Sequence, residues 1–509
     1  MKISHLKQFF SINKLSILAL LSLIFILTLS LQSRLTETTT SPDASENLLI
    51  AYNLAYHGSF SLDKDTTNTY APTNYREPLP IYFLAAHIKL TPSLTSDLTP
   101  QTISQGPALA TLKHHNLIWA FACLMGVAVT VLLTIKPRIT ASIAAAAAVY
   151  LSYQFFLVGA VDILLTEIQA ATLLIGSSVT LILALRTRRP MWFILTGVLL
   201  GCLTLTKAVF LYVGIGLIGV LLITYLIKRP PYWSRRQTVQ RIALIGTVTL
   251  LTLSPWLIRN YQQFDRLEVT QRGGAVLLTR AYKNQMDILG GFYTYAPSAI
   301  RPRLGNLLSF SADDLEVGGK LQHLNRSTSS SFAAADLEAE RAGRPEDAIS
   351  YHKKARAEYV RLLNLYTAQG ANDPEYEADK AMQDEAIDLI RHDPVRHLLT
   401  TAVFMWRGMW CMNIDKSSVP TELGGLLLNG LAFLALWVMA LVGLWKLNPD
   451  MMGIGLMSVG AIAFFALASH NIPRYTEPMI PNMLVALVVL AVWTGQWFTG
   501  TIIGKVQQR

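Results

Sequence analysis

The sequence predicts an α-helical polytopic membrane protein with about ten transmembrane helices and an outward soluble domain of mixed α/β structure. Two observations carry this prediction. Of the 509 residues, 52% are hydrophobic and only 15% are charged, which is too apolar for an ordinary soluble protein. The apolar residues also gather in repeated runs close to the roughly 20 residues that cross a bilayer core. A single-span anchor is excluded, because one span would leave most of these runs unexplained.

The predicted spans lie in both halves of the chain. They cover residues 15–31, 115–135, 141–160, 163–185, 191–206, 208–227, 242–258, 424–445, 452–469 and 478–498. We expect the first to be an uncleaved span, because no small-x-small cleavage site follows it. A further apolar stretch at 399–412 contains Arg407 and is short, so it fits a helix lying on the membrane surface better than a span.

The loops between the spans alternate in charge. With the N-terminus inside, the inner segments hold sixteen Lys and Arg residues against one acid, Asp450. The first span itself follows Lys2, Lys7 and Lys14. Basic inner loops fix the orientation of a membrane protein. The net charge of +10 is therefore a topology signal and does not indicate a nucleic-acid partner.

This topology divides the chain into three parts. Residues 1–258 form an N-terminal transmembrane module with a first outward loop at 33–114, residues 259–398 form an outward soluble domain, and residues 399–509 form a juxtamembrane helix and a C-terminal transmembrane module. The three cysteines, Cys123, Cys202 and Cys411, have no ligand spacing, so we expect neither a disulfide framework nor a Cys-type metal site.

Local patterns predict elements in the outward parts. Helical spacing of apolar residues predicts an amphipathic helix over 44–57, ended at Gly58, and a second helix beginning after Arg76. Alternating apolar residues around Gly273–Gly274 suggest strands broken by a turn. Residues 332–391 read as two helices separated near Gly370–Pro374.

Asp43 is the leading catalytic candidate, because a carboxylate that opens an outward helix could receive a proton from a substrate hydroxyl. The alternative needs no substrate. Asp43 followed by Glu46 three residues later also fits an N-cap with a capping-box partner. The local sequence leaves both interpretations open.

Asp162 and Glu167 form a second acidic pair at the outer end of the fourth span. An ionisable group within an apolar run usually faces a protein interior or a wet cavity, which favours a function or a buried partner for Glu167. Asp162 alone could be a solvated loop residue. Asp43 and Asp162 together could bind a divalent cation, although no spacing specifies one and no cofactor is required.

Four basic residues lie at the outward ends of spans or in outward loops, against the inner bias of the chain. They are Arg76, Lys207, Arg259 and Arg474. Each could simply extend to lipid headgroups. Together they would suit a phosphate or diphosphate held at the outer leaflet.

These pieces resemble a known family, the GT-C membrane glycosyltransferases that use polyprenyl-phosphate-linked sugars, including protein O-mannosyltransferases and lipid A aminoarabinose transferases. The matching stretches, in order, are PDASENLLIAYNLAYHGSF, YREPLPIYFLAA, DILLTE, LTLTKA, SPWLIRNYQQFDRLEVTQRGG and HNIPRYTEPMIP. The family's first outward loop often has two adjacent acids, whereas Ala44 follows Asp43 here, so a metal-assisted version is less supported.

The resemblance implies an inverting transfer from a polyprenyl-phosphate sugar to a glycolipid, polysaccharide or protein hydroxyl, at the outer face of a plasma membrane, most simply a bacterial inner membrane. It implies that Asp43 activates or positions the acceptor and that Asp162 and Glu167 are further catalytic acids. The four basic residues would hold the donor phosphate. Tyr75, Tyr261 and Tyr475 lie in the matching stretches and are candidate substrate contacts.

Two other classes of function stay open at the level of sequence. In a proton-coupled lipid or sugar transporter, Glu167 would be the coupling group, but no paired broken spans appear in corresponding halves. In a non-catalytic membrane scaffold, the outward domain would bind a partner.

Overall fold

The computed structural model describes residues 14–38, 41–64, 70–94, 98–228, 234–271, 273–414 and 416–506, and every regular element in these ranges is helical. Some of the predicted inner cations, namely Lys2, Lys7, Arg229 and Arg509, lie outside the described residues.

The N-terminal membrane module is built from apolar helices that pack side by side. It comprises α2 (Lys14–Ser30), η1 (Leu31–Arg34), α7 (His115–Thr134), α8 (Arg138–Ser152), the π-helical turn η2 (Tyr153–Leu157), α9 (Val158–Ala160), α10 (Glu167–Thr187), α11 (Pro190–Thr204), α12 (Phe210–Lys228) and α13 (Arg235–Phe264). The C-terminal module adds α20 (Pro394–Met409), α21 (Val419–Lys446), α22 (Pro449–Ala468), α23 (Pro473–Thr476), η6 (Glu477–Met479) and α24 (Ile480–Val506).

Each of the ten predicted spans coincides with a helix. Within the described ranges, nine helices are long and apolar enough to cross a membrane, and the remaining predicted span is the shorter apolar helix Pro190–Thr204. The chain is therefore a multi-pass membrane protein. Of the stretch at 399–412, which we did not count as a span, residues 399–409 belong to the 16-residue helix α20, and the helix ends before Trp410.

Helix α10 occupies the interior of the bundle. It packs against α7, α11 and α22, so it joins the N-terminal module to the C-terminal one. Its first residue, Glu167, is 4% exposed. Because α10 is surrounded by other helices, a charged side chain at its first turn faces protein rather than lipid.

The segment predicted to form the first outward loop comprises α3 (Pro42–His57), α4 (Pro78–Leu90), α5 (Pro100–Ile103) and α6 (Gly106–Lys113), and we call it the first outward segment. The helix predicted at 44–57 is confirmed, and it ends at Gly58, whose φ of 69° lies in the left-handed region that glycine adopts readily. The helix predicted after Arg76 is also confirmed, with Pro78 at its start. The apolar faces of α3 and α4 share one core with Leu164 and Trp256 from the membrane module.

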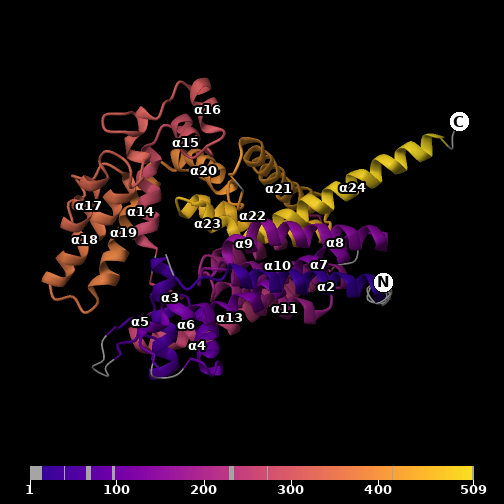
Figure 1. Cartoon of the computed structure of the whole chain (residues 1–509), viewed down its shortest axis with the longest axis horizontal. Coiled ribbons are helices and arrows are strands. Elements are labelled where there is room, and N and C mark those ends of the chain that lie inside the picture. Colours follow the sequence, from indigo (N-terminus) through magenta and orange to yellow (C-terminus); the bar gives the residue numbers. More distant parts are fainter. Residues whose placement is uncertain are drawn as a thin grey trace.

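The second outward segment is helical throughout its described residues. It comprises α14 (Gly274–Tyr282), η3 (Lys283–Gln285), α15 (Ile288–Thr294), α16 (Arg301–Leu308), η4 (Asp313–Leu315), η5 (Gln322–Leu324), α17 (Ala333–Ala342), α18 (Tyr351–Ala368) and α19 (Pro374–His392). Both outward segments lie at the same end of the bundle, opposite the end at which α24 terminates (Figure 1).

The predicted strands around Gly273–Gly274, and with them the mixed α/β character of this segment, are wrong for the described residues. Gly274 begins α14, where its backbone N–H donates to Asp379 Oδ1 of α19 at 2.9 Å. Leu278 and Ala281 then face the core shared with α18 and α19. Leu267 and Val269, whose alternation suggested a strand, lie in the irregular segment before α14, and the apolar residues 275–278 lie within α14, where a short apolar run does not distinguish a strand from a helix.

The helices predicted in 332–391 are confirmed in part. The break is present, with Gly370 at φ 74° and Asp373 capping α19 through a hydrogen bond from Tyr376 N. The part before the break, however, contains two helices, α17 and α18, instead of one. The N-cap Ser350 separates them, since its side chain accepts from Lys353 N and donates to Asp336 Oδ2.

The crossing of α14 and α19 gives a prediction with a built-in control. A Cβ on Gly274 would lie 1.9 Å from the Asp379 carbonyl oxygen, whereas a Cβ on Gly273 would meet nothing within 4 Å. Gly274→Ala should therefore destabilise the protein by about 2 kcal/mol through overpacking, and Gly273→Ala should change stability little. Thermal unfolding of the purified variants in detergent measures the difference, and equal midpoints would contradict the close crossing.

Candidate active site

Asp43 lies inside the first turn of α3, after the N-cap residue Ser41, so it is not the N-cap that the capping-box interpretation required. Its carboxylate instead contacts two arginines. Oδ1 accepts a hydrogen bond from Arg76 Nη2 at 2.6 Å, and Oδ2 accepts one from Arg474 Nη2 at 2.7 Å. Asp43 thus bridges a residue of the first outward loop and a residue near the last span.

Arg76 is buried, with 6% of its surface exposed, and it has a second carboxylate partner in Glu46. Arg76 Nε donates to Glu46 Oε2 at 2.9 Å, so Glu46, which was interpreted as a capping partner, is an ion-pair partner instead. Because both acids lie on α3, one turn apart, a single guanidinium can contact both. The pair holds the loop before α4 against α3.

The loop that carries Arg76 is also attached to the turn that carries Lys207. Leu79 N donates to Leu205 O at 3.1 Å at the start of α4, and Ala208 N donates to the side chain of Glu77 at 3.4 Å. These two contacts hold the loop before α4 beside the turn after α11. The turn after α11 also places Lys207 next to Glu167, the first residue of α10.

Glu167 is the second carboxylate between two cations. Its Oε1 lies 3.1 Å from Lys207 Nζ and 3.7 Å from Arg474 Nε. Arg474 therefore contacts both Asp43 and Glu167. The six residues form an alternating series of acids and bases that we call the charge chain: Glu46, Arg76, Asp43, Arg474, Glu167 and Lys207.

The two arginines decide the protonation of Asp43. Burial alone raises the pKa of the Asp43 carboxyl, but the positive charges and hydrogen bonds of Arg76 and Arg474 outweigh it and hold that pKa well below its usual range. Asp43 is therefore ionised at neutral pH. In this arrangement it is also a weak base, because a carboxylate bound by two guanidinium groups gains little from accepting a proton.

A cavity of about 360 Å³ opens beside the charge chain. Three charged residues line it, Glu167, Arg474 and Glu477, together with the aromatic residues Phe155, Phe156 and Trp410. The sequence reasoning missed Glu477. The available signal was its place three residues after Arg474 in HNIPRYTEP, within the same tight turn before the last span. A cavity with charged groups at one side and aromatic walls suits an amphiphilic ligand.

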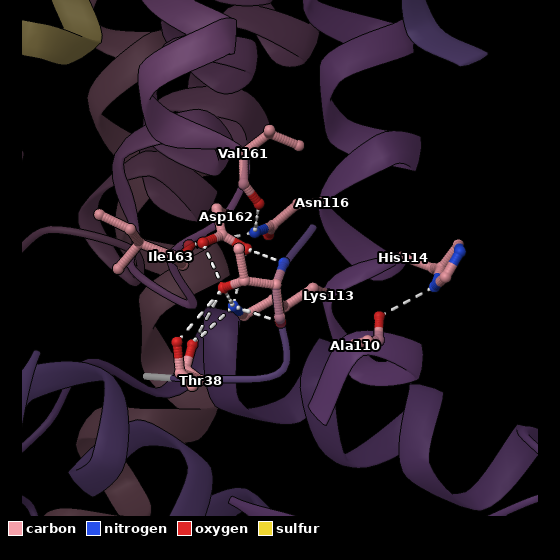
Figure 2. A network of polar contacts seen from close by, with 9 residues as sticks. Thr38, Ala110, Lys113, His114, Asn116, Val161, Asp162 and Ile163 are labelled. Carbon is pink, nitrogen blue, oxygen red and sulfur yellow. Dashed lines mark hydrogen bonds and ion pairs between the residues drawn. The ribbon is translucent and has the colours of Figure 1, made fainter. Parts of the chain in front are cut away.

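Asp162 lies in a separate network with Lys113 and the chain segment after the first span (Figure 2). Its Oδ1 accepts from Lys113 Nζ at 2.7 Å, and its two oxygens also accept from Thr36 N at 2.6 Å and Thr36 Oγ1 at 2.7 Å. The neighbouring carbonyls of Val161 and Ile163 accept from Asn116 Nδ2, which fixes this loop on α7. Asp162 thus anchors the loop that leads into Glu167.

No group of three or more His, Cys, Asp or Glu side chains that could hold a metal occurs in the part of the chain that the structure describes. Asp43 and Asp162, which were considered as a pair of ligands, each bind a cationic side chain of the protein. Their oxygens therefore face protein donors, and this donor set does not fit a divalent cation in the arrangement shown.

Arg259, the fourth predicted phosphate ligand, contacts other residues. Its guanidinium carbon lies 4.7 Å from the Trp256 ring centroid and 5.2 Å from that of Phe264, and Nη1 donates to Thr73 O at 2.9 Å. These contacts attach the end of α13 to the loop that carries Arg76. Arg259 therefore stabilises the loop that carries Arg76 and is not itself a member of the charge chain.

The three tyrosines suggested as substrate contacts lie in different surroundings. The Tyr75 ring lies 5.6 Å from the guanidinium carbon of Arg76. Tyr475 follows Arg474 directly, and its ring stacks on Phe465 at 5.2 Å. Tyr261 is 54% exposed on α13. The first two therefore flank arginines of the charge chain.

Comparison with known proteins gives matches among solved structures alone: no family model and no curated protein sequence matches the chain. The oligosaccharyltransferase AglB of Archaeoglobus fulgidus, solved with an inhibitory peptide and a dolichol-phosphate, is 12% identical, with a TM-score of 0.47 over 97% of this chain and 52% of that one. A complex of the same oligosaccharyltransferase with Zn and sulfate is 14% identical, with a TM-score of 0.47 over 94% of this chain and 50% of that one.

A third structure is that of ArnT from Cupriavidus metallidurans bound to undecaprenyl phosphate. It is 14% identical, with a TM-score of 0.36 over 92% of this chain and 77% of that one. The chain spans about half the length of the oligosaccharyltransferase that it matches. Both proteins belong to the GT-C membrane glycosyltransferases, the family that the sequence motifs resemble.

The charge chain predicts a pH dependence of stability. Because the pKa of Asp43 is lowered in the folded protein, its ion pairs stabilise the fold above the unfolded pKa of about 4, and this stabilisation is lost as the pH falls through the lowered folded value. Asp43→Asn should therefore cost roughly 1 kcal/mol at about pH 6, and the difference from the wild type should shrink toward about pH 3.

Thermal unfolding across this pH range measures the effect. Asp388→Asn is the matched control, because the Asp388 side chain is 79% exposed and lies 3.8 Å from Arg391. If Asp43→Asn and Asp388→Asn gave the same unfolding midpoints at every pH, the ion pairs of Asp43 would not stabilise the fold.

Proposed function

We propose that the chain transfers a sugar from a polyprenyl-phosphate-linked donor to an acceptor hydroxyl at the outer face of the membrane, with inversion at the anomeric carbon. The observation that carries the proposal is the position of Arg474, which lines the cavity and contacts both Asp43 and Glu167. A cation for a leaving phosphate thus lies within contact distance of a carboxylate that can serve the acceptor. The membrane would be a plasma membrane, most simply a bacterial inner membrane.

The donor phosphate would bind on the cation side of the charge chain. Arg474 is the most accessible of its cations, with 35% of its side chain exposed, against 14% for Lys207 and 7% for Arg76. A phosphate entering from the cavity would therefore meet Arg474 first. Arginine can contact two phosphate oxygens at once, and fixed cations stabilise the negative charge that grows on the phosphate as it leaves.

Binding of the donor would also change Asp43. The negatively charged phosphodiester of the donor attracts the Arg474 guanidinium away from Asp43, and the pKa of the carboxyl then returns toward its usual value. The donor thereby converts a weak base into a stronger one at the moment when a base is required. An acceptor hydroxyl is not deprotonated before the donor is in place.

The reaction balances with these groups. The acceptor oxygen forms a bond to the anomeric carbon while the bond from that carbon to the phosphate oxygen breaks. The proton of the acceptor hydroxyl passes to Asp43, and the bonding electron pair leaves with the phosphate toward Arg474 and Lys207. Attack from the side opposite the phosphate inverts the anomeric carbon. Glu167 would hold Arg474 and Lys207 in place, and Asp162 would fix the loop before Glu167.

The first functional prediction concerns Asp43. In cells that depend on this protein, Asp43→Asn should abolish the transferred sugar increment, a loss of at least about 100-fold, because the base is absent. Mass spectrometry of envelope glycolipids and glycoproteins measures the increment, with the amount of protein in the membrane measured in parallel. Asp388→Asn is the control and should keep the increment. Full transfer by Asp43→Asn would overturn the assignment of Asp43.

The second functional prediction separates two of the basic residues. Arg474→Gln should weaken the binding of undecaprenyl phosphate to the purified protein on the order of tenfold, because a charge-assisted hydrogen bond is lost. Arg259→Gln should leave binding nearly unchanged and lower the unfolding midpoint instead, because Arg259 packs on Trp256 and Phe264. The reverse order of affinities would place the phosphate at Arg259.

A further inference from the structure

A second group of basic and polar side chains lies where η3, α18 and α20 meet the turn after α22. We call it the basic cluster, and it consists of Lys283, Tyr295, Arg326, His352, Arg407 and His470. Among the described residues, none of its cations forms an ion pair with a carboxylate. This composition is opposite to that of the charge chain, in which acids and bases alternate.

Distances between the side chains define the middle of the cluster. The guanidinium carbon of Arg407 lies 4.2 Å from the ring centroid of Tyr295, and Lys283 Nζ lies 5.5 Å from the same centroid. Arg407 Nη1 donates to His470 O at 2.9 Å. Two cations therefore approach one tyrosine ring from residues that are distant in the sequence.

The histidines close the cluster on the side of α18. The rings of His352 and His470 have centroids 6.0 Å apart. Arg326, whose side chain is exposed, lies close enough to lower the pKa of both histidines, after the larger effect of their burial. The cluster thus extends from a buried lysine to an arginine at the surface.

Part of the basic cluster is buried, and a buried positive charge is unfavourable unless a negative charge lies beside it. Lys283 is 2% exposed and His470 is 5% exposed. Burial lowers the pKa of Lys283 well below its usual value, and the charges of Arg407 and Arg326 lower it further. Buried charges in proteins are ordinarily paired, because an unpaired ion in a poorly hydrated site costs several kcal/mol.

Several polar atoms in the cluster also lack partners. The Tyr295 hydroxyl, His352 Nδ1 and His470 Nδ1 are buried and have no hydrogen-bond partner among the residues that the structure describes. Each can donate a proton to an acceptor oxygen. A cluster of cations and unpaired donors, with no acid among the described residues, is complementary to an anion that carries several oxygens.

Arg280 shows what a purely structural cation looks like in the same region. It is 0% exposed, and its guanidinium donates to the Ala466 carbonyl at 3.0 Å and to the His397 carbonyl at 2.9 Å. Its remaining donors reach the side chains of Asn284, Thr400 and Thr401. Protein acceptors therefore satisfy Arg280, whereas the ammonium of Lys283 faces the rings of Tyr295 and Phe404 at more than 5 Å.

The basic cluster borders the proposed active site through a short connection. His470 lies four residues before Arg474, and its ring centroid lies 6.0 Å from that of Tyr475. A substrate that reaches the charge chain could therefore extend to the cluster.

We propose that Lys283, Arg407 and His470, with the Tyr295 hydroxyl and His352, bind a phosphate group of a lipid substrate of the proposed transfer. A phosphate offers a compact negative charge and several acceptor oxygens, which match the two cations and the unpaired donors. The inference rests on the proposed function. Two sources share this chemistry, a phosphorylated headgroup of the acceptor lipid and the phosphate of the polyprenyl donor.

Lys283→Met gives the sharpest test, because methionine keeps the length and removes a buried charge. If Lys283 serves a ligand, this variant should be at least as stable as the wild type but should bind inorganic phosphate on the order of tenfold more weakly. The purified full chain in detergent is titrated with inorganic phosphate by calorimetry, and its unfolding midpoint is followed with and without phosphate. Lys320→Met is the control, because Lys320 is an exposed lysine of the same segment.

A second variant, His352→Gln, keeps the proposal testable if Lys283→Met fails to fold, and it should also weaken phosphate binding. The proposal is overturned if phosphate leaves the wild-type midpoint unchanged, or if Lys283→Met binds phosphate as tightly as the wild type does. It is also overturned if Lys283→Met lowers the midpoint and the loss of binding follows unfolding. Asp43→Asn should keep the phosphate shift, so a failure of the proposed transfer remains distinguishable from a failure of this site.

Competition in nanodiscs separates the two sources. Displacement of inorganic phosphate by undecaprenyl phosphate would assign the site to the donor, whose phosphate would then bind at Lys283 and Arg407 instead of at Arg474. Displacement by phosphatidic acid, but not by phosphatidylcholine or undecaprenyl phosphate, would assign it to a phosphomonoester on the acceptor lipid. Displacement by none of these lipids would overturn the assignment to a lipid substrate.

Discussion

The bridge from Arg76 through Asp43 to Arg474 is the constraint on which the arrangement of the site depends. The Asp43 and Arg474 side chains meet although 431 positions separate them in the sequence. Arg76 is almost fully buried, so its charge requires carboxylate partners in the folded protein. This bridge attaches the helix α3 to the turn before the last span. It thereby fixes the position of the N-terminal module relative to the C-terminal one.

Around this bridge, contacts with residues outside the charge chain position the backbone segments. The loop before α4 hydrogen-bonds to Leu205 and Ala208, and the Asp162 loop is held by Lys113 and Asn116. These contacts let the buried helix α10 begin at Glu167, in contact with Lys207. The segments that carry Arg76, Lys207 and Glu167 are therefore held by contacts outside the charge chain. Such support is what allows a charged site to reorganise around a ligand without unfolding.

The charge chain and the basic cluster differ in how their cations are neutralised. In the charge chain every cation has a carboxylate partner, so the protein itself supplies the counter-charge. In the basic cluster, Lys283 and Arg407 share the Tyr295 ring and have no carboxylate partner among the described residues. The charge chain can bind an anion only if one of its cations leaves its carboxylate partner. In the basic cluster, a bound anion would supply the negative charge that the cations lack. The first therefore suits coupling to a reaction, and the second suits recognition.

The sequence by itself determined the membrane architecture and the local helices of the first outward segment. Runs of apolar residues are a chain-local property, so they predicted the ten spans that appear as helices, whereas the orientation inferred from the Lys and Arg bias stays a prediction. The same holds for α3, which ends where Gly58 can adopt a positive φ, and for the start of α4 at Pro78. The motifs also marked Asp43, Arg76, Glu167 and Arg474 as residues of interest.

The tertiary structure alone decided what these residues contact. From the sequence, Asp43 could be a helix cap or a catalytic group, because the short-range pattern with Glu46 carries no information about the contact with Arg474. Gly274 reads as a turn, because only its approach to the Asp379 carbonyl shows that it is the close crossing of two helices. The basic cluster had no local signal beyond single basic residues, and Glu477 had only its place three residues after Arg474. Pairing between distant charges depends on which surfaces the packed helices bring together, and that information is distributed over the whole chain.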